Sequence, residues 1–362
     1  MKEFKEYEGP FIHTKETYKK IMFSYIITFV PFFVYNFYMN GIIKWQTSKN
    51  ISDLLYPLIF TFLPLLLVLI FETIYKMIFI KNQTFKNFEA ILVDDGSTDE
   101  SIEIIKKFCD KNENFKFIQQ ENRGPAAARN AALEISTGKY IAFMDSDDFI
   151  EPEFLERMYT AAEENNADIA CCNFKLYYPE KDAKIQLPFN SIKGIYTKKQ
   201  ALKKLILDVR IHYFVWNKLI KRNLISDNNF KFDEMYFEDI SASPKLFFYA
   251  NKIVVISDAL YNYTSRETSI LHSINTAKVN DFIKSLGSIR NFLENKNAYK
   301  DYNTHLWLYS QKVKFVSYYY ILMIHAKAMN FNKFLENLNS ATKSISYFSG
   351  NIFIPTKEDV PK

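Results

Sequence analysis

The chain has 362 residues, of which 48% are apolar and 24% are charged, so wholesale disorder is excluded and two domains, or one domain with an anchor, are expected. The net charge is only +5 and basic residues are scattered among acidic ones, which argues against a nucleic-acid-binding surface. Its three cysteines, Cys109, Cys171 and Cys172, form neither a disulfide framework nor a metal-ligand spacing, and this favours a reducing compartment.

The first part of the chain has the character of membrane segments. No residue of 21–43 is charged, and this length is sufficient for a helix that crosses a bilayer. A second apolar run, 54–75, can also cross if Glu72 is accommodated within it. Lysines are more frequent on the two outer flanks than in the loop between the runs, which predicts that both flanks are cytoplasmic. We therefore expect residues 1–81 to anchor the chain in the cell membrane through two transmembrane helices. Two buried core helices are the alternative.

A short N-terminal motif resembles a known family of membrane proteins. Gly9-Pro10-Phe11-Ile12-His13-Thr14-Lys15 and the run from Lys20 are similar to the start of the NqrB/RnfD family, which supplies a membrane component of Rnf-type electron transport complexes. The resemblance covers about residues 3 to 80 and implies many further spans and a Ser-Gly-Ala-Thr site for flavin attachment. Only Ser340-Ala341-Thr342 is similar to that site, without its glycine. The resemblance therefore implies an origin for this segment, and it does not support flavin binding.

From about residue 82, apolar strands alternate with helices. Strands are expected over 88–93, 115–119, 140–144 and 168–174. Helices are expected after Ser97 or Thr98, from Pro125, from Pro152, over 197–208 and, as several helices, from 276 onward. This alternation predicts an α/β, Rossmann-like fold with a mostly parallel sheet over 82–270 and a helical C-terminal region over 271–362.

Two acidic clusters follow predicted strands. Asp94 and Asp95 come after 88–93, and Asp145-Ser146-Asp147-Asp148 comes after 140–144. Because ligands of such sheets bind outside the carboxyl ends of the strands, we expect the two clusters to share one crevice. Asp145 and Asp147 alternate around Ser146, and such a pair can hold Mg²⁺ or Mn²⁺ against a diphosphate. An isolated Asp-x-Asp, however, is usually a turn or a solvated loop.

Six stretches in order resemble the family 2 glycosyltransferases, which have the GT-A fold. They are Ile91–Ser101, Glu121–Asn130, Tyr140–Asp148, Val215–Leu219, Phe237–Asp239 and Arg266–Ile270. Together they cover about residues 82 to 270. The resemblance implies inverting transfer of a sugar from a nucleoside-diphosphate sugar, of the UDP type, to a glycan or lipid-linked acceptor in cell-surface polysaccharide synthesis.

The resemblance also implies roles for individual residues. Asp145 and Asp147 correspond to the metal and diphosphate site, Asp94 and Asp95 to nucleoside contacts, and Asp239 to the general base. The expected substrate-binding set also includes Gly124, Arg129, Trp216, Glu238 and Arg266.

Several of these residues have structural alternatives. Arg129 could be an ion-pair partner within the protein, and Trp216 could be a buried core aromatic. Glu238 and Asp239 could form the acidic first turn of a helix.

The sequence departs from the family pattern before Asn82. The family's opening strand, turn and helix are not recognisable there, and residues 77–81 are membrane-like. We therefore expect a fusion of a truncated membrane component with a truncated transferase, a sheet that lacks a central strand, and weakened donor binding. The alternative function is a fragment of an Rnf-type membrane component fused to a non-functional transferase remnant.

Overall fold

The computed structural model describes residues 77, 79–98, 101–179, 183–186, 193–265 and 275–328. The chain divides into two compact units, Met1–Ile74 and Tyr75–Lys362, and every described residue belongs to the second. The expected transmembrane helices, 21–43 and 54–75, lie outside the described residues. Within the described part, no helix has both the length and the apolar character needed to cross a membrane.

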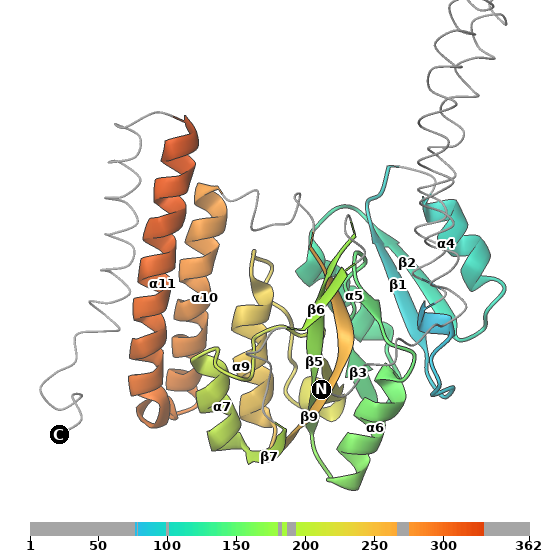
Figure 1. Ribbon diagram of the computed structural model, residues 1–362, viewed down its shortest axis with the longest axis horizontal. Coiled ribbons are helices and arrows are strands. Elements are labelled where there is room, and N and C mark those ends of the chain that lie inside the picture. Colours follow the sequence, from blue (N-terminus) through green and yellow to red (C-terminus); the bar gives the residue numbers. More distant parts are fainter. Residues whose placement is uncertain are drawn as a thin grey trace, which may run out of the picture. The chain divides into compact units, whose positions relative to one another are not determined.

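A small parallel sheet carries the first acidic cluster (Figure 1). β1 (Ala90–Asp95) pairs in parallel with β2 (Phe115–Gln120), and α4 (Ser101–Cys109) connects them. The helix packs on β2 through Phe108, whose ring lies 4.9 Å from that of Phe115. These elements form where the sequence predicts them.

The main sheet has seven strands, in the order β3 (Tyr140–Ala142), β8 (Lys218–Lys221), β5 (Ile169–Tyr178), β9 (Lys252–Thr264) and β4 (Phe149–Ile150), with β6 (Ala183–Gln186) on β5 and β7 (Gly194–Thr197) on β9. Its only parallel pair among the described strands is β5–β9. The expected mostly parallel sheet is therefore wrong, and the sheet is mixed. Apolar runs such as β5 indicate burial on both faces, which a mixed sheet can also provide, so they do not fix strand direction.

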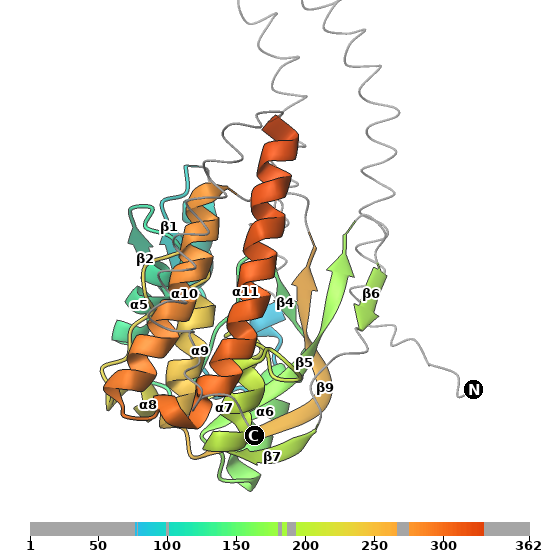
Figure 2. The same cartoon turned by 90° about the vertical axis from the view of Figure 1, so that its left-hand side faces the viewer.

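Helices cover both faces of the main sheet (Figures 1 and 2). Successive residues of β5 alternate between two cores, as the strand period requires. Ile169 and Cys171 face the core that includes α7 (Lys198–Ile206), α9 (Glu238–Tyr249), α10 (Thr276–Asn295) and α11 (Tyr299–Ala328). Ala170 and Cys172 face the core that includes α6 (Phe154–Glu164). The helical C-terminal region is confirmed over the part that the structure describes.

Two further helices complete the described elements here. α5 (Pro125–Ile135), with Pro125 in its first turn, packs on β1 and β2, and its Ala126 belongs to the same core as Ile141 of β3; α8 (Asn223–Ser226) follows β8. Thr197 caps α7 as expected, because its hydroxyl accepts a hydrogen bond from Gln200 N while Gln200 Oε1 accepts one from Thr197 N.

The two sheets meet along edges that have no strand partner among the described residues. β1 pairs only with β2, and β3 pairs only with β8. The apolar residues 91–93 of β1 are only half-buried, unlike those of β5. The expected absence of a central strand stays a prediction, because the residues before 77 lie outside the described part of the chain.

Glu89 bridges the gap between these edges. Its Oε1 accepts hydrogen bonds from Thr137 N (2.6 Å), Thr137 Oγ1 (2.8 Å) and Gly138 N (2.9 Å), just before β3. Its Oε2 accepts one from Lys116 Nζ on β2 (2.6 Å). Burial would raise the pKa of Glu89, but these hydrogen bonds lower it from 4.5 to about 2.

The bridge predicts a pH-dependent contribution to stability. We expect Glu89→Gln to lower the free energy of unfolding by about 2 kcal/mol at neutral pH, because the charge-assisted bonds are lost. A carboxylate whose pKa is lowered in the folded state stabilises the fold at pH values above its unfolded pKa. This stabilisation is lost as the pH falls through the folded pKa and the carboxylate is protonated. Urea unfolding should therefore show the difference between variant and parent shrinking from pH 4.5 towards pH 2.

Glu103→Gln is the matched control, because among the described residues Glu103 pairs only with exposed Lys106 at 3.9 Å and its own side chain is 66% exposed. This change should have little effect on unfolding. A difference for Glu89→Gln that stays constant with pH would contradict the bridging role.

Candidate active site

Arg129 lies at the centre of the candidate site. Its Nη2 donates to Asp145 Oδ1 at 2.7 Å, and its Nη1 donates to Glu238 Oε1. The side chain is 13% exposed, and its guanidinium lies 5.6 Å from the ring centre of Phe232. Burial lowers the pKa of Arg129, but the two carboxylates raise it above its ordinary value. Arg129 therefore stays charged and joins α5, the segment after β3 and the start of α9.

Asp95 positions the helix that carries Arg129. Its carboxylate accepts hydrogen bonds from Gln120 Nε2 (2.7 Å), Arg123 N (2.8 Å) and Gly124 N (2.7 Å). Gly124 has φ +85, a left-handed conformation that glycine adopts without a steric penalty, and Pro125 follows. In this structure Asp95 thus fixes the loop before α5, while its contact with a nucleoside stays a prediction.

Asp94 has a different environment from Asp95. It is buried, and its Oδ1 accepts a hydrogen bond from Ser97 N at 3.2 Å. Its Oδ2 is also buried and has no hydrogen-bond partner among the described residues. A buried carboxylate oxygen without a partner is costly, and it is therefore a candidate contact for a ligand.

The segment after β3 contains one carboxylate that is satisfied within the protein, Asp148, and one that is available to a ligand, Asp147. Asp148 is fully buried, and its oxygens accept hydrogen bonds from Tyr261 OH (2.7 Å) and Thr264 N (2.8 Å). Burial raises the pKa of Asp148 to about 8, opposed by the Thr264 bond and assisted by the charge of Asp147. Asp147 is half-buried and has no hydrogen-bond or ion-pair partner in the described part of the chain. Asp147 is therefore available to a ligand, and Asp148 is not.

Glu238 and Asp239 form the first turn of α9, where negative charge is favourable. The preceding residue, Phe237, has φ +60, a strained conformation for a bulky side chain. Burial raises the pKa of Asp239 to about 7, with a contribution from the charge of Glu238 and against that of Arg129. Glu238 is engaged by Arg129, whereas Asp239 is poised to exchange a proton near neutral pH.

Trp216 lies in the core. It is 4% exposed, and its ring stacks on Tyr261 at 4.3 Å and on Phe214 at 4.6 Å. Tyr261 in turn accepts a hydrogen bond from Asp145 N at 3.1 Å. Trp216 thus supports the Asp145 segment through Tyr261, and its role in an acceptor pocket stays a prediction. Arg266 lies outside the described residues.

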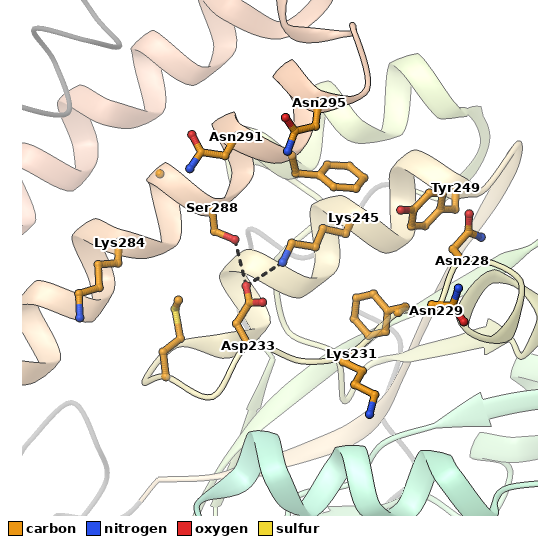
Figure 3. Close-up of a pocket in the computed structure, with 14 residues that line it drawn as sticks. Asn228, Asn229, Lys231, Asp233, Lys245, Tyr249, Lys284, Ser288, Asn291 and Asn295 are labelled. Carbon is orange, nitrogen blue, oxygen red and sulfur yellow. Dashed lines mark hydrogen bonds and ion pairs between the residues drawn. The ribbon is translucent and has the colours of Figure 1, made fainter.

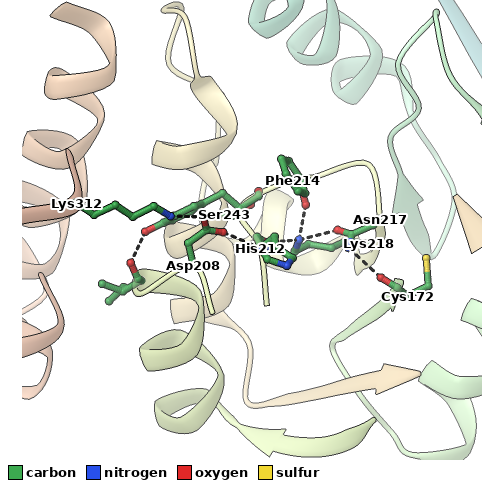
Figure 4. Close-up of polar contacts among 10 residues, drawn as sticks. Cys172, Asp208, His212, Phe214, Asn217, Lys218, Ser243 and Lys312 are labelled. Atoms are coloured by element: carbon green, nitrogen blue, oxygen red, sulfur yellow. Dashed lines mark hydrogen bonds and ion pairs between the residues drawn. The ribbon is translucent and has the colours of Figure 1, made fainter. Parts of the chain in front are cut away.

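Sequence reasoning missed a buried lysine beside Trp216. Figure 4 shows the Lys218 ammonium directed at the preceding loop, where it donates to His212 O (2.8 Å), Phe214 O and Asn217 Oδ1 (2.9 Å). Burial lowers the pKa of Lys218. The Trp-Asn-Lys sequence was the available signal, because a lysine next to an apolar strand needs nearby acceptors.

The crevice expected between the two acidic clusters stays a prediction. No contact between Asp94 or Asp95 and Asp145 occurs in the described structure, and the clusters are connected through Gly124 and Arg129 of the α5 region. The described residues include no group of three or more His, Cys, Asp or Glu side chains suited to a metal ion. Asp145 and Asp147 remain a pair of the kind that binds Mg²⁺ together with substrate phosphates.

Comparison with known proteins places these motifs in a family. Residues 71–225 match the family described as "Glycosyl transferase family 2", and this match begins upstream of Asn82. The cholesterol galactosyltransferase of Borreliella burgdorferi is 32% identical over 254 residues, which cover 67% of this chain and 70% of that protein. The putative glycosyltransferase EpsH of Bacillus subtilis is 29% identical over 231 residues, which cover 63% of this chain and 67% of that protein.

Among solved structures, S. aureus TarS 1-349 in complex with UDP-GlcNAc is 23% identical, covers 77% of this chain and 88% of its own, and has a TM-score of 0.48. Family membership follows from the extent and identity of the galactosyltransferase match. This chain belongs to glycosyltransferase family 2 and is a glycosyl transfer enzyme with a GT-A-like α/β fold.

Proposed function

We propose that this chain transfers a sugar from a nucleoside-diphosphate sugar, of the UDP type, to a hydroxyl group of a glycan or lipid-linked acceptor, with inversion. The observation that carries the proposal is the gathering of Asp145, Glu238 and Asp239 around the single cation of Arg129, with Asp147 close in sequence. A surplus of carboxylates suits a site that receives a metal–diphosphate complex. The Borreliella relative is named a cholesterol galactosyltransferase, which supports a lipid acceptor. The apolar runs 21–43 and 54–75 and the lysines on their outer flanks support a membrane-anchored enzyme whose catalytic domain is cytoplasmic.

The residues present fit a divalent cation. Asp147 has no protein partner within the described residues, and Asp145 uses only Oδ1 for Arg129. Mg²⁺ and Mn²⁺ favour hard oxygen ligands, commonly one or two carboxylates with substrate phosphates. Asp145 and Asp147 would hold the ion, which when bound neutralises charge on the diphosphate leaving group.

Asp239 supplies the base in this proposal. Its carboxylate takes the proton from the acceptor hydroxyl as that oxygen forms a bond to the anomeric carbon. The bond from that carbon to the diphosphate oxygen breaks, and the nucleoside diphosphate leaves with the electron pair. A base with a pKa near 7 is well matched to neutral pH. Asp94 offers its unpartnered Oδ2 to a base N–H or a ribose hydroxyl of the donor.

Binding of UDP in Mn²⁺ tests the metal site. We expect Asp147→Asn to weaken UDP binding at least about tenfold, equal to about 1.4 kcal/mol, without lowering the melting temperature. Asp145→Asn should weaken binding similarly and also destabilise the fold by about 2 kcal/mol, because Arg129 then stays buried with one carboxylate fewer. Titration calorimetry and thermal unfolding on detergent-solubilised chain measure the two effects.

Asp258→Asn is the control, since Asp258 pairs with exposed Arg157 at the surface (2.8 Å) and should affect neither quantity. UDP binding by Asp147→Asn equal to that of the unaltered chain would exclude Asp147 as a ligand. Absence of UDP binding by the unaltered chain would agree with the expected loss of a strand from the donor pocket, and tight binding would show that the pocket is intact.

The pH dependence of donor hydrolysis tests the base. Because only the deprotonated carboxylate accepts a proton, the rate of UDP release from UDP-sugars should rise with pH through about 7 and then level. Asp239→Asn should lower this rate by roughly 10²- to 10⁴-fold and leave UDP affinity unchanged. Asp227→Asn, at an exposed position after α8, is the control. A pH profile that is flat around neutrality would refute the assignment.

A further inference from the structure

A cavity lined by both polar and apolar side chains opens beside the segment that leads to Glu238 and Asp239. Its volume is about 780 Å³, within the range of small-molecule sites. Residues 228–235, the C-terminal half of α9 and one face of α10 form its walls (Figure 3). Lys284, Ser288, Asn291 and Asn295 follow one another at spacings of three and four along α10, so they line the same face of that helix.

The cavity has a fixed floor. Asp233 Oδ2 accepts hydrogen bonds from Lys245 Nζ (2.7 Å) on α9 and from Ser288 Oγ (2.9 Å) on α10. Figure 3 shows these three side chains converging. They tie both helices to the 228–235 segment, so the walls are held in place without a ligand.

The amide groups around this floor are available to a ligand. The side chains of Asn229, Asn291 and Asn295 have no hydrogen-bond partner among the residues that the structure describes. Each amide offers two donors and an acceptor oxygen, a combination that matches adjacent hydroxyl groups. The aromatic rings of Tyr249 and Phe292 also line the cavity and offer apolar contact to a sugar ring.

The charges of the lining do not favour an anion. Its lysines all have carboxylate partners: the pairs are Lys231–Glu134 at 3.4 Å, Lys245–Asp233 at 2.7 Å and Lys284–Asp281 at 3.0 Å. A phosphate or nucleic-acid site would instead present unpaired cations. The lining thus suits a neutral molecule rich in hydroxyl groups.

The segment 228–235 both lines the cavity and contacts the candidate site. Phe232 lies against Arg129, and its backbone N and O bond to Asn130 of α5 at 2.8 and 3.0 Å. The same segment then continues to Glu238. We propose that this cavity binds neutral sugar residues of the acceptor glycan, away from the transferred sugar. This inference rests on the proposed transferase function and extends it to the acceptor.

Saturation-transfer NMR on the whole chain tests the proposal with three neutral tetrasaccharides: maltotetraose, cellotetraose and tetra-N-acetylchitotetraose. At least one should bind, and Asn291→Ala combined with Asn295→Ala should weaken it about tenfold, as expected for the loss of two amide contacts. Alanine is favourable in a helix, so the melting temperature should not fall. Asn280→Ala, at an exposed position on the same helix outside the cavity, is the matched control and should bind like the parent.

No saturation transfer from any of the three saccharides, or transfer that the double variant leaves unchanged, would overturn the proposal. UDP-sugar hydrolysis is measured on the same samples. Hydrolysis that persists in the double variant, together with lost saccharide binding, places the cavity in acceptor recognition. Absence of UDP-sugar hydrolysis in the parent would instead contradict the proposed transferase function. The saccharide titration does not test that function, so the two failures are distinguishable.

Discussion

The double ion pair of Arg129 is the interaction on which the candidate site depends. Asp145 and Glu238 come from segments far apart in the chain, and like charges would keep them apart without the guanidinium between them. Conversely, a buried guanidinium is tolerated only because both carboxylates accept its hydrogen bonds. The single positive charge of Arg129 therefore holds two negative charges close together and neutralises only one of them. Asp147 and Asp239 are not bonded to Arg129 in the described structure and lie near this excess charge in the sequence. In the proposed function they serve the metal ion and the acceptor proton.

Several residues of the acidic motifs act by holding others in place. Asp95 accepts three hydrogen bonds from the loop before α5, so its charge sets the start of the helix that carries Arg129. Asp148 and Tyr261 do the same for the segment that presents Asp145. A motif with many carboxylates thus need not place each of them on a substrate. Within Asp145–Asp148, Asp148 is satisfied by hydrogen bonds within the protein. Asp147 and one carboxylate oxygen of Asp145 remain available to a ligand.

Local features of the sequence were sufficient to locate most elements, because capping and strand patterns depend on neighbouring residues. Thr197 and Pro125 begin their helices as predicted. Strand direction was mispredicted, because β8 enters between β3 and β5 through contacts that no local pattern encodes. The same limit applies to the site. The spacing of the motifs indicated the acidic residues, but the pairing of Arg129 with Glu238 spans 109 positions and had no local signal.

The division of the sheet shows which part of the candidate site is held least rigidly. In a continuous sheet, ladder hydrogen bonds would hold Asp94 rigidly relative to Asp145. Here two of the described connections are Glu89, which bonds to the loop before β3, and α5, which begins at the loop held by Asp95 and ends just before β3. Both connections consist of hydrogen bonds from side chains or single backbone groups. Such bonds open more easily than the ladder of hydrogen bonds between paired strands. Asp145 is held by Tyr261 of β9 as well as by Arg129 of α5, so one of its two supports lies outside the α5 connection. Relative movement of the two sheets would therefore displace Asp94 and Asp95 more readily than it would displace Asp145.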